Sequence, residues 1–292
     1  MTFPAGLVVD REGVATIVAG IDVEPVLLTR GHADGAAWEP HELVTGRAVF
    51  GELAGRTALL VRMDPFTMAQ EILVVADGRA EVVAAGCDLA VFGSSHLLSP
   101  DVVTYMCGGD RTVARRGPSG WTVVATLPRV LVDGAVGDDG TVYLLDTNLA
   151  QPTSFWMIQD GVVTESTADC VGTVGDVGFC GGQLFATFEQ PYDRGSLPAL
   201  GTWRDGAWQL ETIAGDVAGS GALAFDEACH PFVALGDLVY SRGPDGWTAS
   251  SIGMDGSVHD LAAFDGRIYA TYESITDSSH AFLAWAHLAP SR

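Results

Sequence analysis

Apolar residues along this chain fall in short runs of four to seven, which glycine, aspartate and proline interrupt. The runs are rich in Val, Ile, Leu, Phe, Tyr and Thr, most of which are residue types favoured in strands. No segment keeps an apolar period of 3.6 residues for three turns, so we expect almost no helix. The pattern predicts an all-β protein.

A short turn recurs between these runs. Its clearest copies are Arg116–Trp121 and Arg242–Trp247, which read Arg-Gly-Pro-Ser-Gly-Trp and Arg-Gly-Pro-Asp-Gly-Trp. The glycine that all copies share recurs every 40 to 45 residues, at Gly35, Gly78, Gly120, Gly161, Gly206 and Gly246. Glycine supplies the positive φ that a tight hairpin needs, so each copy predicts a turn between two antiparallel strands.

A second element repeats in step with this turn. It is a run of small and aliphatic residues that ends at Val9, Phe50, Phe92, Val136, Phe179, Phe225 or Phe264. In the last full unit, strands are predicted at 221–225, 231–235, 238–242 and 247–252. Four antiparallel strands at a period of about 42 residues are typical of a β-propeller blade.

The two repeats together predict one domain, a seven-bladed β-propeller of four-stranded antiparallel blades. The expected blades are 5–44, 47–86, 88–127, 130–168, 172–213, 219–252 and 257–292. The last blade stops where its hairpin should begin, so we expect it to be incomplete or closed by the N-terminus.

The turn at 241–247, Ser-Arg-Gly-Pro-Asp-Gly-Trp, resembles the Asp-box of sialidase-like propellers. That motif is a Ser-x-Asp-x-Gly-x-x-Trp turn between the third and fourth strands of a blade. The copy here is one residue shorter and its aspartate is displaced. Sialidases also use three arginines, a tyrosine nucleophile and a glutamate, but Arg47 is the only arginine at the predicted strand starts. The resemblance therefore implies the architecture and not the activity.

Charge narrows the range of partners. The net charge of −22 comes from 37 acidic residues against 15 arginines, with no lysine. A surface this acidic repels nucleic acid and anionic membranes, and the lack of lysine excludes Schiff-base chemistry. Small molecules, carbohydrates or proteins remain as expected partners, and the sequence does not predict an oligomeric state.

The cysteines and the N-terminus bear on location. The N-terminal residues lack the pattern of a signal peptide, and no apolar stretch is long enough to cross a membrane. The five cysteines form no Cys-x-x-Cys pair, and lie at Cys87, Cys107, Cys170, Cys180 and Cys229. We expect a cytoplasmic protein with reduced, structural thiols, with a Cys170–Cys180 disulfide as the alternative for an exported one.

Candidate chemistry lies at the predicted starts of the first strands. The residues three or four positions before the repeated aromatic are Arg47, Asp88, Asp133, Asp176, Gly221 and Asp260, with His259 beside the last. The four aspartates would converge on the mouth of a central channel. Oxygen ligands in a ring suit Ca²⁺ or Mg²⁺, and a nearby histidine extends the choice to Mn²⁺ or Zn²⁺. The alternative is that each aspartate caps a loop and faces water separately.

Two long loops between second and third strands add ligand candidates. They run over 189–194 and 273–280, and with Arg47 they contribute Glu189, Tyr192, Arg194, Glu273 and His280. They can equally be solvated connections. Tryptophans 38, 121, 208 and 247 begin the fourth strands, where packing between blades is expected and stacking against sugars is the alternative.

A binding module is the first functional expectation, because no catalytic motif is complete. The alternative is a metal-dependent hydrolase or lyase. In that case a cation held by Asp88, Asp133, Asp176 and Asp260 would polarise a carbonyl group. His259 would be the acid or base, since histidine exchanges protons near neutral pH.

Overall fold

The computed structural model describes residues 4–9, 14–21, 24–30, 39–42, 48–54, 57–63, 70–76, 79–87, 95–128, 132–146, 154–167, 173–192, 195–214, 221–251, 256–274 and 281–287. These residues form 27 strands. Within those ranges there is no helix, and hence none long and apolar enough to cross a membrane. The all-β prediction is confirmed.

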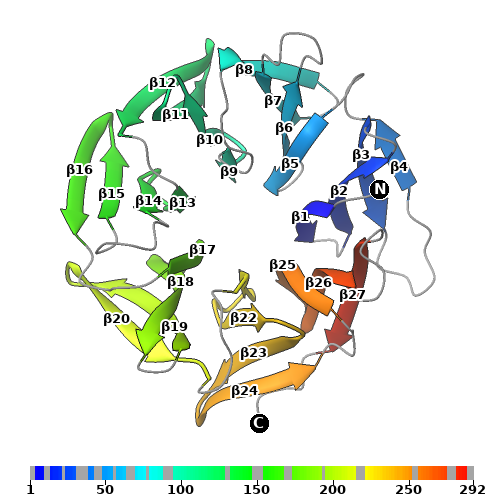
Figure 1. The fold of residues 1–292 in the computed structure, drawn as a ribbon, viewed down its shortest axis with the longest axis vertical. Helices are drawn as coiled ribbons and strands as arrows, with labels where there is room; N and C mark the ends of the chain where they lie inside the picture. Colours follow the sequence, from blue (N-terminus) through cyan, green and yellow to red (C-terminus); the bar gives the residue numbers. More distant parts are fainter. Residues whose placement is uncertain are drawn as a thin grey trace. The chain divides into compact units, whose positions relative to one another are not determined.

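The chain divides into two compact units, Met1–Arg129 with Ser278–Phe282, and Val130–Asp277 with Leu283–Arg292. The first unit contains three four-stranded antiparallel sheets (Figure 1). Their strands are β1 (Pro4–Val9), β2 (Ala15–Ile21), β3 (Glu24–Arg30), β4 (Glu39–Glu42), β5 (Ala48–Ala54), β6 (Thr57–Met63), β7 (Gln70–Ala76), β8 (Arg79–Cys87), β9 (His96–Ser99), β10 (Val102–Cys107), β11 (Asp110–Gly117) and β12 (Gly120–Leu127).

The second unit contains three further four-stranded sheets. Their strands are β13 (Val132–Val136), β14 (Val142–Asp146), β15 (Ser154–Gln159), β16 (Val162–Thr167), β17 (Thr173–Cys180), β18 (Gln183–Tyr192), β19 (Gly195–Arg204), β20 (Ala207–Thr212), β21 (Leu223–Phe225), β22 (Pro231–Leu235), β23 (Leu238–Gly243) and β24 (Gly246–Ser251). A seventh sheet has three described strands, β25 (Gly256–Phe264), β26 (Arg267–Ser274) and β27 (Ala281–His287). In the six four-stranded sheets, successive strands lie side by side, so the predicted four-stranded antiparallel repeat is confirmed.

The repeated turns are the hairpins between third and fourth strands. Gly117 pairs with Gly120, and Gly243 pairs with Gly246, on either side of a two-residue turn. Gly120 and Gly246 have φ values of 102° and 112°, which only glycine adopts readily. The copies at Gly35 and Gly78 lie outside the described residues.

Large side chains pack between successive sheets. Trp121, Trp208 and Trp247 each lie partly buried against a core cluster that joins two sheets. Phe179 stacks on Tyr143 of the preceding sheet with ring centroids 5.8 Å apart, and Phe225 packs on Phe185 at 5.0 Å. The predicted packing role is confirmed for these tryptophans, while Trp38 lies outside the described residues.

Candidate functional site

Three of the predicted aspartates lie in the first strands of three sheets of the second unit. Asp133 Oδ1 accepts a hydrogen bond from Gly134 N at 2.8 Å, and its Oδ2 accepts one from Val177 N, in the next sheet, at 3.0 Å. Asp176 repeats the arrangement, with Oδ1 bound to Val177 N at 2.8 Å and Oδ2 to Leu223 N at 2.7 Å. Each of these two carboxylates therefore joins its own sheet to the next one.

The same strands are joined by a threonine. Thr187 Oγ1 in β18 accepts from Asp176 N at 3.0 Å and donates to Gly221 O of the next sheet at 2.8 Å. A Cβ atom at Gly221 would lie 1.6 Å from Ala234 O, so only glycine fits there. This close approach leaves no room for an aspartate side chain at this position of the repeat.

The surroundings of Asp176 shift the pKa of its carboxyl group. Burial raises its pKa well above the ordinary range of an aspartate, and the neighbouring Asp133 carboxylate raises the pKa further. Asp260 adds a smaller effect in the same direction, while the hydrogen bonds from Leu223 and Val177 oppose the rise. The carboxylates of Asp133 and Asp260 therefore lie close enough to Asp176 to affect its ionisation, while the predicted fourth member of the set, Asp88, lies outside the described residues.

His259 and Asp260 lie at a β-bulge in β25. The pairing with β26 shifts between Val258 and Asp260, so His259 is the extra residue, and its side chain is exposed. Asp260 Oδ1 accepts from Leu261 N at 2.8 Å. Over the described ranges, no group of three or more His, Cys, Asp or Glu side chains is arranged to hold a metal ion.

The two long loops predicted at 189–194 and 273–280 are in part strand, which corrects that expectation. β18 continues through Glu189 to Tyr192, which pairs with Gly195 of β19. Glu273 lies within β26 and pairs with Ser257. Backbone pairing of residues 189–192 and 273–274 explains the difference. The predicted site residues Arg47, Asp88, Arg194 and His280 lie outside the described residues, as do the side chains of Tyr192 and Glu273.

The sequence did not reveal a groove in the second unit, formed around sheet β21–β24 and its neighbours. Its volume is about 1020 Å³, and its walls carry Thr202, Arg204, Gln209, Glu211, His230 and Arg242 among other residues. Arg242 Nε binds Glu211 Oε2 at 2.9 Å, and Arg204 donates to Gln183 Oε1 at 3.3 Å. Arg242 and Glu211 come from different sheets, so their contact was not visible in the repeat.

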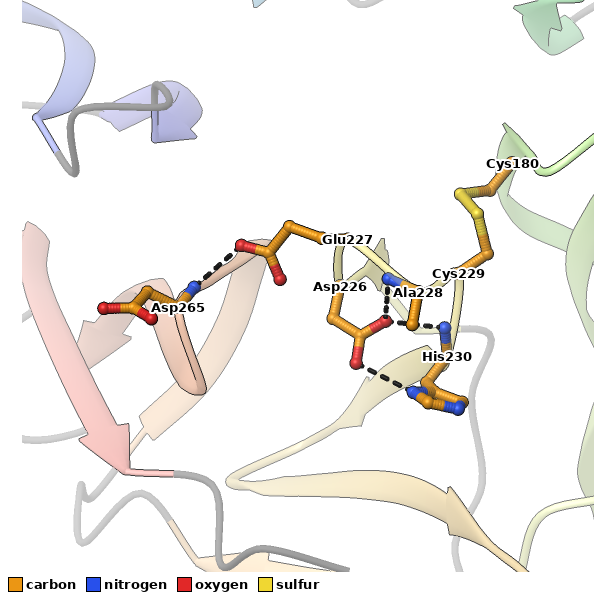
Figure 2. A network of polar contacts seen from close by, with 7 residues as sticks. All are labelled: Cys180, Asp226, Glu227, Ala228, Cys229, His230 and Asp265. Carbon is orange, nitrogen blue, oxygen red and sulfur yellow. Dashed lines mark hydrogen bonds and ion pairs between the residues drawn. A yellow bond between two sulfur atoms is a disulfide. The ribbon is translucent and has the colours of Figure 1, made fainter.

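The turn between β21 and β22 also lines the groove, and Figure 2 shows its polar contacts. Asp226 Oδ1 accepts from Ala228 N and His230 N at 2.9 and 2.8 Å. Its Oδ2 lies 2.9 Å from His230 Nδ1, so the carboxylate orients an imidazole that is 61% exposed. Glu227 Oε1 accepts from Asp265 N at 2.9 Å and so joins this turn to the turn between β25 and β26. An aspartate four residues before a histidine in a short turn is the sequence signal that was overlooked.

Four of the five cysteines form disulfides, so the prediction of reduced thiols was wrong. Cys87 pairs with Cys107, and Cys180 pairs with Cys229, each pair linking two successive sheets. Cys180 therefore does not pair with Cys170, which lies outside the described residues. The partners are 20 and 49 residues apart in sequence and become adjacent only when neighbouring sheets pack together.

Comparison with solved structures identifies proteins of similar fold. Virginiamycin B lyase from Staphylococcus aureus is 10% identical with a TM-score of 0.67, over 98% of this chain and 95% of that one. The β-propeller domain of the Trilobed protease from Pyrococcus furiosus is 10% identical with a TM-score of 0.65, over 99% and 96%. The Cps50 (Swd1) β-propeller domain from Myceliophteria thermophila is 9% identical with a TM-score of 0.61, over 98% of both chains.

No family model and no curated protein matches the sequence. The structural matches include an enzyme and isolated propeller domains, at identities that indicate only a common fold. The chain shares the β-propeller fold with these proteins, and its function has to be argued from its own side chains.

Proposed function

We propose that this chain is a seven-bladed β-propeller that acts as a binding module for a polar small molecule or carbohydrate. The 42-residue period and the seven sheets among the described residues support the number of blades. The groove in the second unit is the observation that carries the binding function.

The groove fits this role in size and chemistry. Its volume of about 1020 Å³ is at the upper end of the range typical of small-molecule sites. Its lining offers hydroxyl, amide and guanidinium groups from Thr202, Gln209 and Arg204, and apolar surface from Phe185 and Leu200. A ligand rich in hydroxyl groups would find both hydrogen-bond partners and an apolar surface along this lining.

The experiment is a thermal-shift screen of glycans and polar metabolites, with each hit measured again by calorimetry. Binding should weaken at least tenfold in Thr202→Val, which removes a hydroxyl from the groove wall and keeps the shape of the side chain. Thr126→Val, at an exposed position of β12 in the first unit, is the matched control and should bind normally. A screen without a single hit, or equal loss in both variants, would contradict the proposal.

A metal-dependent hydrolase or lyase is the second candidate, and the aspartates of the second unit favour it. Asp133, Asp176 and Asp260 interact, and the pKa of Asp176 is raised by burial and by Asp133. A divalent cation would neutralise this repulsion, and His259 would supply the proton transfer. Adding Ca²⁺, Mg²⁺, Mn²⁺ or Zn²⁺ should then raise the thermal midpoint of EDTA-treated protein, and Asp176→Asn should abolish that rise. No rise with any of the four ions would exclude this candidate.

The disulfides favour a different location from the cytoplasm expected from sequence. Stable disulfides form and persist in oxidising compartments and are rare in the cytosol. We therefore propose that the chain matures where Cys87–Cys107 and Cys180–Cys229 can form. Thiol labelling of protein taken from its native cells should leave these four cysteines unmodified until a reductant is added; labelling without reductant would support the cytoplasm.

A further inference from the structure

Arg242, Gly243 and Pro244, which line the groove, belong to one of two hairpins with nearly the same sequence. We call residues 116–121 the Arg116 hairpin and residues 242–247 the Arg242 hairpin. In both, the arginine pairs with the tryptophan across the turn, Arg116 with Trp121 and Arg242 with Trp247. In both, a glutamate from the last strand of the preceding sheet binds the arginine.

In the Arg116 hairpin, one carboxylate satisfies both side chains. Glu81 Oε1 binds Arg116 Nη2, and Glu81 Oε2 accepts from Trp121 Nε1 at 3.1 Å. Glu81 is the third residue of β8, where it pairs with Val74. The third residue of the last strand in the preceding sheet thus accepts hydrogen bonds from both side chains of the hairpin.

The equivalent position beside the Arg242 hairpin is not acidic. The third residue of β20 is Gln209, which pairs with Thr202, and the carboxylate stands two residues later at Glu211. Glu211 reaches Arg242 Nε but not the indole. Trp247 Nε1 is buried and has no hydrogen-bond partner among the described residues. A buried donor without an acceptor is costly and rare in native proteins.

Charges in the groove leave donors for an anion. Glu211 is bound to Arg242 and Asp226 to His230, so the two carboxylates of the groove are already engaged. Arg204 has only the neutral Gln183 oxygen as a hydrogen-bond partner within the described residues. Arg242 binds Glu211 through Nε, so its two terminal nitrogens stay available to a ligand within the same part of the chain. An arginine without a carboxylate partner stands out in a chain with a net charge of −22.

We propose that the ligand of the groove carries an oxyanion, a carboxylate or a phosphate, which takes the place that Glu81 holds in the Arg116 hairpin. The anion would accept hydrogen bonds from Arg242 and Trp247 along the side chain of Gln209, and Arg204 would add a second guanidinium. Arginine suits this role because its planar fork matches the geometry of both groups. The inference rests on the proposed binding function and names the chemistry of the ligand.

The test uses the oxyanions alone on the intact chain. Inorganic phosphate and sodium acetate are titrated at constant ionic strength, with chloride as the reference salt, while the indole N–H resonances are followed by NMR. The Trp247 resonance, assigned by its loss in Trp247→Phe, should shift and saturate with at least one anion. The anion that saturates at lower concentration distinguishes phosphate from carboxylate.

Variants separate specific binding from general charge effects. Arg204→Gln and Arg242→Gln should each weaken the titration at least fivefold, and Gln209→Glu should abolish it by filling the place internally. Arg79→Gln, an exposed arginine of β8 with the same change in net charge, is the matched control and should titrate normally.

No saturable shift with either anion, or equal weakening in Arg204→Gln and Arg79→Gln, would overturn the inference. The proposed binding function would survive that result if a neutral ligand from the screen still bound and still depended on Thr202. If the screen also gave no ligand, both proposals would fall.

Discussion

The Arg116 and Arg242 hairpins show how far one short sequence determines its surroundings. Both have glycine at the same position with a φ above 100°, and both place a tryptophan between two sheets. They differ in the last strand of the preceding sheet, where Glu81 of β8 corresponds to Gln209 of β20. Glu81 of the preceding sheet therefore binds the arginine and the tryptophan of the Arg116 hairpin. In the Arg242 hairpin the buried indole N–H of Trp247 has no partner among the described residues, and the paired Arg242 lines the groove. The turn sequence determines the backbone, and the neighbouring sheet determines the chemistry.

The largest effect is expected when the Arg116 hairpin is made to resemble the Arg242 hairpin. Glu81→Gln removes the charge that binds both Arg116 and Trp121, at a site only about one third exposed (side-chain exposures of 34% and 38% for Arg116 and Glu81). We expect a loss of about 2 kcal/mol in the free energy of unfolding, most of it from the charged hydrogen bond to the indole. Urea titration measures the loss, and Glu211→Gln, which breaks a more exposed pair, should lose about 0.5 kcal/mol. Equal losses would mean that the two hairpins are equivalent after all.

The tryptophans should respond unequally to the same substitution. Trp121→Phe removes a hydrogen bond to a charged acceptor, whereas Trp247→Phe removes a donor that has no partner in the described part of the chain. The lost ring area is similar, so the difference between the two variants reports the hydrogen bond. We expect Trp121→Phe to be the less stable variant by about 1.5 kcal/mol in urea titrations. The opposite order would show that Trp247 Nε1 is satisfied in solution.

One substitution should give the Arg242 hairpin the hydrogen bonds that Glu81 makes to the Arg116 hairpin. Gln209→Glu places a carboxylate at the position equivalent to Glu81, within reach of Arg242 and Trp247. We expect a gain of about 1 kcal/mol, because repulsion from the nearby Glu211 offsets part of the new hydrogen bonds. Differential scanning calorimetry measures the gain, with Gln183→Glu as a groove variant that cannot reproduce the geometry of Glu81. A destabilised Gln209→Glu would show that the two strands are not equivalent in position.

The smallest effect is expected on the pH dependence of stability, through Asp176 and the neighbouring carboxylate of Asp133. The pKa of Asp176 is raised in the folded chain by burial and by Asp133, so the folded state keeps a proton that the unfolded state has lost. The contribution of Asp176 to stability is therefore greatest at acid pH and falls as pH rises from the unfolded pKa through the raised folded pKa. Urea titrations across this range should show a shallower fall in Asp133→Asn, because one repulsion is removed. A steeper fall would contradict the assigned cause.

The repeat in the sequence predicted the strands and turns well because both are local. Strands predicted at 231–235 and 238–242 appear as Pro231–Leu235 and Leu238–Gly243, since glycine and the alternation of apolar residues act over a few positions. The sequence assigned Asp133 and Asp176 to equivalent positions of two repeats, and both lie in the first strands of their sheets. Their hydrogen bonds to Val177 and Leu223 were not foreseen, because they depend on backbone groups 44 and 47 residues away.

The groove and the disulfides could not be predicted from the sequence repeat. Arg242 meets Glu211 only because two sheets face each other, and no repeat interval relates these residues. Cys180 and Cys229 likewise occupy different positions in their repeats, one at the end of a first strand and the other in the following turn. Contacts of this kind depend on the stagger between sheets, which the period of the sequence does not specify.

The bonds of Asp133 and Asp176 also bear on how such a chain can grow. Each carboxylate accepts a hydrogen bond from a backbone N–H of the next repeat. A repeat of about 42 residues therefore carries an acceptor for the repeat after it and a donor for the repeat before it. A duplicated segment would arrive with both halves of the contact already in place. Tandem duplication can therefore add a repeat without a new kind of contact between sheets. A repeat without the aspartate, such as the one with Gly221, is still bound by the aspartate of the preceding repeat.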